Sequence, residues 1–186
     1  TGQREDARPG KPATLLDLDR GAFQIVGIDL SDADRFRGAV LDLDGHVLHR
    51  AERALTGQTG EAAIQLVTDL TAELVDQLTE RPLGIGVGSP GIVDLAGVVL
   101  SAPNLGWADV DLQGTLADRF GLPVVVANDA NVAALAEHSF GGAASDMMLV
   151  KVGHGVGAGL LLGGTPLYGS RFAAGEIGHV VVGTDG

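Results

Sequence analysis

Runs of apolar residues along the chain predict several buried β-strands. Three of these runs have the length of strands and contain or are flanked by glycine, proline or aspartate: residues 23–29, 83–88 and 122–129. Two further runs, Gly38–Leu43 and His46–Arg50, flank Asp44-Gly45, a dipeptide typical of a two-residue hairpin turn. The pattern therefore predicts a sheet that begins with a hairpin.

Between these strands the apolar spacing changes to that of helices. Within residues 60–80, five apolar residues recur on one helix face: Ala63, Val67, Leu70, Leu74 and Leu78. Shorter helices are predicted at 112–120 and 131–140, and residues 98–107 are interpreted as a strand entering a loop. The element order β-β-β-α-β-α-β-α predicts an α/β fold with a mixed sheet and helical crossovers.

A new set of apolar runs follows Gly141-Gly142. The runs at 146–153, 156–164 and 177–183 predict the opening strands of a second sheet. No helix that could cover this sheet follows before Gly186, so we interpret the second sheet as incomplete. Such a sheet would expose apolar surface and strand edges, which predicts self-association into a homo-oligomer.

Composition narrows the classes of partner. The formal net charge is −12, and the only lysines are Lys11 and Lys151, so this chain is a poor ligand for a nucleic-acid backbone. The apolar runs are too short to span a bilayer and the first ten residues are polar, which predicts no membrane partner and a cytoplasmic location. The absence of cysteine excludes disulfides and thiolate metal sites within the chain.

Five motifs, in this order, resemble the ROK family of sugar kinases and sugar-responsive repressors. They are "GVGSPGIVD" (Gly86–Asp94), "APNLGW" (Ala102–Trp107), "VVVANDANVAALAE" (Val124–Glu137), "GHGVGAGLLLGG" (Gly153–Gly164) and "AAGEIGHVVV" (Ala173–Val182). The resemblance covers residues 23–186 and implies the actin-like ATPase (ribonuclease H-like) fold. It implies a first lobe at 23–140 and the start of a similar second lobe at 141–186.

The resemblance also implies a sugar site for a hexose or an N-acetylhexosamine. Its ligands would be Asn104, Asn128, Asp129, Glu176 and His179. In a kinase, Asp129 would be the catalytic base that takes a proton from the attacking sugar hydroxyl. The residues alone leave plainer interpretations open: a helix N-cap for Asp129, a turn residue for Asn104, and solvated loop residues for Glu176 and His179.

A kinase of this family would bind ATP and Mg²⁺ between two loops, which here contain Asp29 and the glycines Gly153, Gly155 and Gly157. The family begins with Asp-x-Gly-x-Thr. Here Ser31 stands in the place of the glycine and Ala33 in that of the threonine, while Asp32 and Asp34 add negative charge. We interpret this loop as a decayed nucleotide site.

The second loop matches the family better, although His154 stands where kinases commonly carry threonine. Glycines let backbone amides approach an anion. A tight β-hairpin that needs glycine explains several of the same residues, so both interpretations stay open.

The family also implies zinc, with His179 as one ligand. ROK proteins usually continue after Gly-His with Cys-x-Cys-Gly-x-x-Gly-Cys-x-Glu, whereas this chain ends seven residues after His179 and has no cysteine. Because zinc is normally held by four ligands, we expect no cofactor in this chain. The final sugar-binding glutamate of that segment is missing as well.

Residues 1–22 are polar and contain Pro9 and Pro12. They are similar to the linker that joins a winged-helix DNA-binding domain to the sugar-binding domain in ROK repressors. We therefore interpret the chain as the sugar-sensing domain of a ROK-type transcriptional regulator, cut at both ends, that contacts DNA only through a missing N-terminal domain. The alternatives are an ATP-dependent hexose kinase and a fragment that binds nothing.

Overall fold

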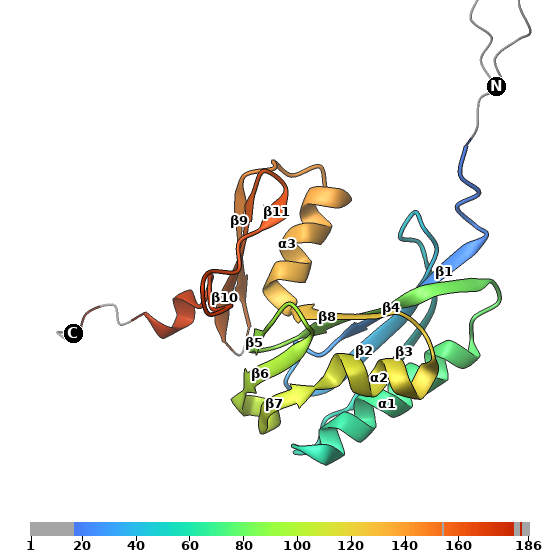
Figure 1. The fold of residues 1–186 in the computed structure, drawn as a ribbon, viewed down its shortest axis with the longest axis horizontal. Helices are drawn as coiled ribbons and strands as arrows, with labels where there is room; N and C mark the ends of the chain where they lie inside the picture. The colour runs from blue at the N-terminus through green and yellow to red at the C-terminus, as the bar shows by residue number, and fades with distance from the viewer. Residues whose placement is uncertain (1–16, 154, 181–182, 184–186) are drawn as a thin grey trace, which may run out of the picture.

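A five-stranded mixed sheet forms the centre of the computed structural model, which describes residues 17–153, 155–180 and 183 (Figure 1). Its strand order is β3-β2-β1-β4-β8. Strands β1, β4 and β8 run parallel. At one edge, β2 pairs antiparallel with β1, and β3 pairs antiparallel with β2. The strands span Phe23–Asp29 (β1), Arg35–Leu41 (β2), Val47–Ala54 (β3), Arg81–Ser89 (β4) and Val124–Asn128 (β8). The predicted α/β fold with a mixed sheet is confirmed.

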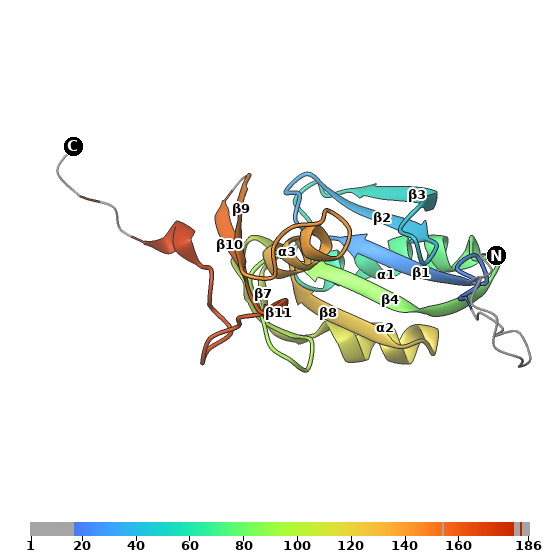
Figure 2. The same cartoon turned by 90° about the horizontal axis from the view of Figure 1, so that it is seen from above.

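The two faces of this sheet differ in side-chain size. Helices α1 (Glu61–Asp76) and α2 (Leu112–Phe120) lie on one face, as both views show (Figures 1 and 2). Bulky side chains from sheet and helices fill that layer, including Val26, Phe36, Val87, Leu70 and Leu116. Burying each stabilises the fold by about 1.5–3 kcal/mol. The opposite face carries Gly27, Gly86, Gly88 and Ala127, which contribute to the wall of a cavity of about 800 Å³.

Helix α3 (Asp129–Ser139) follows β8 directly and connects the first sheet to a second one (Figure 1). The second sheet has the order β11-β10-β9, with β9 at Met147–Val152, β10 at Val156–Leu162 and β11 at Thr165–Pro166. Gly159 of β10 packs against the Ala130 carbonyl and the Ala134 methyl of α3, where a larger residue would collide. Since α3 contacts both sheets, the predicted lobe boundary at residue 140 stays a prediction.

Several predicted bounds were wrong. A small sheet, β5-β6-β7, occupies Ile92–Val93, Val98–Ala102 and Trp107–Asp111, with the short 3₁₀ helix η1 at Pro103–Leu105. Only the middle strand of this small sheet was predicted, because β5 is two residues long and β7 (WADVD) is largely polar and exposed. The run predicted as a strand at 177–183 begins as a 3₁₀ helix, η2 (Ile177–His179), while Val181 and Val182 lie outside the described residues.

The predicted helices at 60–80 and 131–140 span Glu61–Asp76 and Asp129–Ser139. In the described part of the chain, none of the helices has the length and apolar character needed to cross a bilayer.

Candidate functional site

The carboxyl ends of the three parallel strands meet at one edge of the first sheet. In register across that edge, Asp29 pairs with Gly88, and Ser89 pairs with Asn128. Helix α3 begins at the same edge, and a Cβ at Gly88 would lie 3.6 Å from the Asp129 Cα. Open α/β sheets bind ligands at this kind of edge. The structure therefore places Asp29, Asn128 and Asp129 where a ligand site is expected.

Asn128, and not Asp129, is the N-cap of α3. Its Oδ1 accepts hydrogen bonds from the backbone N–H of Ala130 (3.0 Å) and Asn131 (3.1 Å). Its Nδ2 donates to the carbonyl oxygen of Gly91 (2.8 Å) and to Asp129 Oδ1 (3.3 Å). Both N–H donors and both acceptor sites of the Asn128 amide thus have protein partners. Its predicted contact with a sugar would require the sugar to replace one of these partners.

Asp129 is the first residue of α3 and forms an ion pair with Lys151 of β9. The Lys151 Nζ donates to Asp129 Oδ2 at 2.7 Å, and Asp129 Oδ1 accepts from the Ala130 N–H at 2.9 Å. The side chains are 17 % (Asp129) and 36 % (Lys151) exposed, so the pair is reachable from solvent. Lys151 was missed as a site residue because it stands among apolar residues in the sequence, and only the structure places it on the face toward α3, opposite the exposed Val150 and Val152.

The loop between β1 and β2 uses its own backbone amides internally. Asp29 Oδ1 accepts from the Ser31 N–H (3.0 Å), and Asp32 Oδ1 accepts from the Asp34 N–H (2.9 Å). Arg37 donates to Asp32 Oδ2 at 2.6 Å and so balances one of the added carboxylates. Asp29 and Arg37 also line the 800 Å³ cavity. The wall of that cavity does not include Asp129, so the cavity lies beside the candidate sugar residues.

The glycine loop joins β9 to β10. Gly153 donates its N–H to the Gly155 carbonyl (2.9 Å), and His154 lies outside the described residues. A Cβ at Gly153 or Gly155 would meet no atom within 4 Å, and neither residue has a φ in the left-handed range. The described hairpin geometry therefore does not itself require glycine at these two positions, so the tight-hairpin interpretation does not account for them.

The "APNLGW" motif separates into buried and exposed residues. Trp107 is buried and its Nε1–H donates to the Gly60 carbonyl at 3.0 Å, which ties this motif to the start of α1. Leu105 is buried as well, and Gly106 adopts φ 65° beside Thr59. Asn104 is exposed, so its amide is available to a ligand.

Glu176 and His179 lie next to β10. The Ala158 N–H donates to the Gly175 carbonyl at 2.8 Å, which holds this segment against the strand. Glu176 Oε2 and His179 Nε2 are 3.7 Å apart, and His179 is 85 % exposed. Among the hydrogen bonds and ion pairs of the described residues, none joins either side chain to Asp129.

These residues do not fit the zinc site that the family implies. A tetrahedral site needs four ligands, the chain has no cysteine, and within the described residues His179 belongs to no group of three metal-binding side chains.

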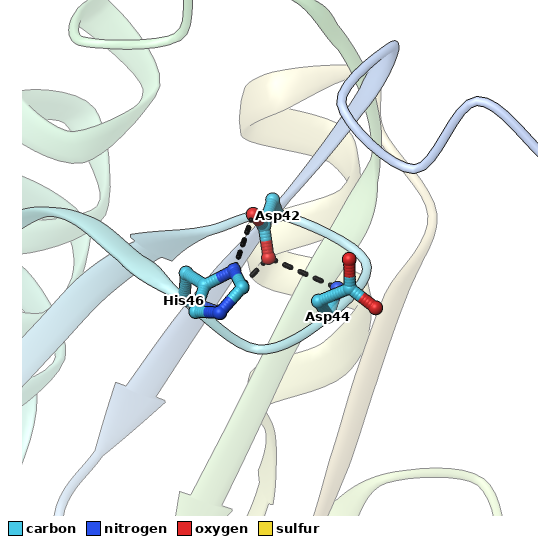
Figure 3. Close-up of side chains that lie close together, drawn as sticks. All are labelled: Asp42, Asp44 and His46. Carbon is cyan, nitrogen blue, oxygen red and sulfur yellow. Dashed lines mark hydrogen bonds and ion pairs between the residues drawn. The ribbon is translucent and has the colours of Figure 1, made fainter.

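One such group does occur elsewhere, in the β2–β3 turn, and consists of Asp42, Asp44 and His46 (Figure 3). Asp42 accepts hydrogen bonds from the backbone N–H of Asp44 and His46 (both 2.9 Å) and lies 3.0 Å from His46 Nδ1. Asp44 accepts from Arg20 at 2.7 Å. The bond to Asp42 raises the pKa of His46, and the same bond lowers that of Asp42. These bonds account for the shape of the turn without a metal.

The chain is similar in sequence to curated proteins of two classes, repressors and kinases. The chain is 34 % identical over 183 residues to the xylose repressor of Caldicellulosiruptor bescii, covering 95 % of this chain and 46 % of that protein. It is 35 % identical over 170 residues to a glucokinase of Halalkalibacterium halodurans, covering 84 % and 49 %. The chain thus spans about half the length of these relatives.

Solved structures give the same pair of protein classes. A ROK family transcriptional regulator, a homolog of the Escherichia coli Mlc protein, superimposes with a TM-score of 0.79 at 28 % identity over 90 % of this chain and 44 % of that one. A ROK family glucokinase from Streptomyces griseus, solved with glucose and AMPPNP, gives 0.78 at 32 % identity over 88 % and 52 %. The sequence profile of the ROK family matches residues 25–186, and the chain belongs to the ROK family.

Proposed function

We propose that the chain is the sugar-sensing, effector-binding part of a ROK-family transcriptional regulator that binds its sugar without phosphorylating it. Its similarity to xylose repressors and to a solved ROK regulator supports this proposal. The proposed effector is a hexose or an N-acetylhexosamine, and the names of the relatives add xylose to the sugars worth testing. Because the chain carries a net charge of −12, any contact with DNA would come from residues outside it.

The observation that carries the proposal is the internal bonding of the β1–β2 loop. A nucleotide phosphate needs free backbone N–H groups and positive charge. Here the N–H groups of Ser31 and Asp34 already donate to carboxylates of the same loop, and Arg37 is engaged by Asp32. The loss of one preorganised donor commonly costs about a hundredfold in rate, so several losses would leave little phosphoryl transfer.

An ATP-dependent ROK sugar kinase is the second candidate. It is favoured by Asp129 at the ligand edge of the sheet and by the glycines at 153 and 155, which the hairpin does not need. Similarity to glucokinases supports it as well. In that case Asp129 would be the catalytic base and ATP with Mg²⁺ the cofactor.

Two assays on the full-length protein separate the candidates. We expect isothermal titration calorimetry to detect binding of glucose, N-acetylglucosamine or xylose, and a coupled ADP-release assay with the same sugars to stay at background. Asp129→Ala and Glu176→Ala should weaken the binding. Robust ADP release that Asp129→Asn abolishes would overturn the regulator proposal and establish the kinase.

A further inference from the structure

We propose that Lys151 is a further sugar-binding side chain. It donates a hydrogen bond to the same sugar hydroxyl group that donates one to Asp129. This inference rests on the proposed function. It adds a residue to the site and defines the ligand class as an uncharged sugar.

The backbone brings Lys151 to the start of α3. On β9 the side chains of Met148, Val150 and Val152 are exposed, so Lys151 lies on the opposite face, toward α3. Its register partner on β10 is Gly157, and a Cβ at Gly157 would lie 4.0 Å from the Ala130 Cβ in the first turn of α3. From this position the Lys151 ammonium reaches Asp129.

Stability alone does not explain a lysine at this position. The pair is partly exposed, and exposed ion pairs typically contribute only about 0–1 kcal/mol. The other residues of β9 on this face, Met147 and Leu149, are apolar and also of intermediate burial, so packing on this face does not itself call for a lysine at 151. Lys151 is also the only lysine among the described residues. A cation reachable from solvent at the predicted sugar edge therefore indicates a role toward a ligand.

The chemistry of the pair suits a sugar hydroxyl. An ammonium group has three N–H donors and Asp129 takes one of them, while a hydroxyl group both donates and accepts. One hydroxyl oxygen within reach of both groups can accept from Lys151 Nζ and donate to an Asp129 oxygen. Because the two charges cancel, the pair favours an uncharged hydroxyl group. A sugar phosphate at the same place would gain no net attraction from the pair, because repulsion by the Asp129 carboxylate offsets attraction to the Lys151 ammonium.

The test compares two variants that each remove one positive charge. Lys151→Met keeps the apolar stem but loses the donor. Arg53→Met removes the partner of Glu73 on the distant β3–α1 contact and serves as the matched control. The full-length protein is titrated calorimetrically with glucose, N-acetylglucosamine and xylose. We expect Lys151→Met to raise the dissociation constant about 10- to 100-fold, the range for loss of a hydrogen bond to a charged group. Arg53→Met should change it less than about twofold.

Monodeoxy analogues of the bound sugar distinguish direct contact from a structural effect. If Lys151 binds a hydroxyl group, removal of that hydroxyl in one analogue should weaken binding to the wild type more than it weakens binding to Lys151→Met, which has only the bond to Asp129 left to lose. Equal weakening of every analogue by Lys151→Met would overturn the contact. Lys151→Arg keeps a cationic donor and the ion pair, and should retain most of the wild-type affinity. This variant keeps the test decisive if Lys151→Met fails to fold.

The remaining outcomes separate this inference from the proposed function. Wild-type affinity retained in Lys151→Met would overturn the role of Lys151 and leave sugar sensing intact. Tighter binding of glucose 6-phosphate than of glucose by the wild type would overturn the ligand class. No binding of any uncharged sugar by the wild type would overturn both the inference and the proposed function.

Discussion

At the scale of single residues, Asn128 and Asp129 divide two tasks at the start of α3. Asn128 caps the helix and anchors the Gly91 carbonyl, whereas Asp129 projects to Lys151. A sequence pattern that places both at a strand–helix junction predicts a cap but does not decide which residue provides it. The decision depends on backbone geometry, because the cap residue must be extended, as Asn128 is with φ −61° and ψ 136°.

We therefore expect Asn128→Ala to destabilise the protein by about 1–2 kcal/mol, the usual range for a lost N-cap. Asn128→Asp retains an acceptor for the Ala130 and Asn131 N–H groups and is the matched control, with a smaller loss. Urea denaturation followed by circular dichroism measures both. A loss from Asn128→Ala no larger than that from Asn128→Asp would contradict the capping role.

The β2–β3 turn makes a prediction about pH. The hydrogen bond that His46 donates to Asp42 raises the pKa of His46 above 6.5 and lowers that of Asp42 below 3.8. Protonated His46 and ionised Asp42 thus stabilise the turn between about pH 4 and 6.5. The contribution is lost as pH rises through the raised pKa of His46, and again as pH falls through the lowered pKa of Asp42.

NMR titration of the His46 ring protons should show the raised pKa, and Asp42→Asn should bring it back toward 6.5. Asp44→Asn is the control within the same turn. It should shift the pKa less, because Asp44 acts on His46 only through space. An equal effect of the two variants would show that general negative charge, and not the hydrogen bond, determines the pKa.

At the scale of elements, the β9–β10 hairpin contains two kinds of glycine. Gly159 is needed for packing, since a Cβ there would collide with the Ala130 carbonyl and the Ala134 methyl. Gly155 has open space around it. Sequence alone could not separate the two, because both belong to one glycine-rich motif and only the position of α3 distinguishes them.

We expect Gly159→Ala to lower the free energy of unfolding by about 1–3 kcal/mol, as overpacking does in a dense core. Gly155→Ala should change the free energy of unfolding by no more than about 0.5 kcal/mol, while weakening the binding of any ligand that approaches the loop. Thermal unfolding of the two variants checks the difference. Comparable destabilisation by Gly155→Ala would mean that the hairpin itself requires that glycine.

The elements that could be predicted from the sequence are those in which the apolar pattern continues over many residues. The strands of the central sheet and α1 repeat their pattern over several residues, and they were found close to the expected positions. Strand β5 was missed because it is only two residues long, and β7 because most of its positions are exposed. In the candidate site, the carboxylates at the sheet edge followed from the strand ends. Lys151 and the internal bonding of Ser31 and Asp34 depend on tertiary contacts that no local pattern contains.

At the scale of the whole molecule, the second sheet leaves one face and one edge uncovered in the described structure. Strand β9 is an edge strand, and its side chains Met148, Val150 and Val152 are exposed, the last by 75 %. Helix α3 covers the other face. An exposed apolar edge strand is a ready template for pairing with another chain.

We therefore predict that the chain of residues 1–186 self-associates through β9. Sedimentation velocity over a concentration series should show a rising average mass. Val150→Lys should reduce the association, because a lysine on an edge strand places an unpaired charge in any strand-to-strand contact. Leu95→Lys makes the same chemical change at an exposed site on the β5–β6 turn and should leave the association unchanged. A monomer at every concentration would contradict the prediction, and equal effects of both lysine variants would place the contact away from β9.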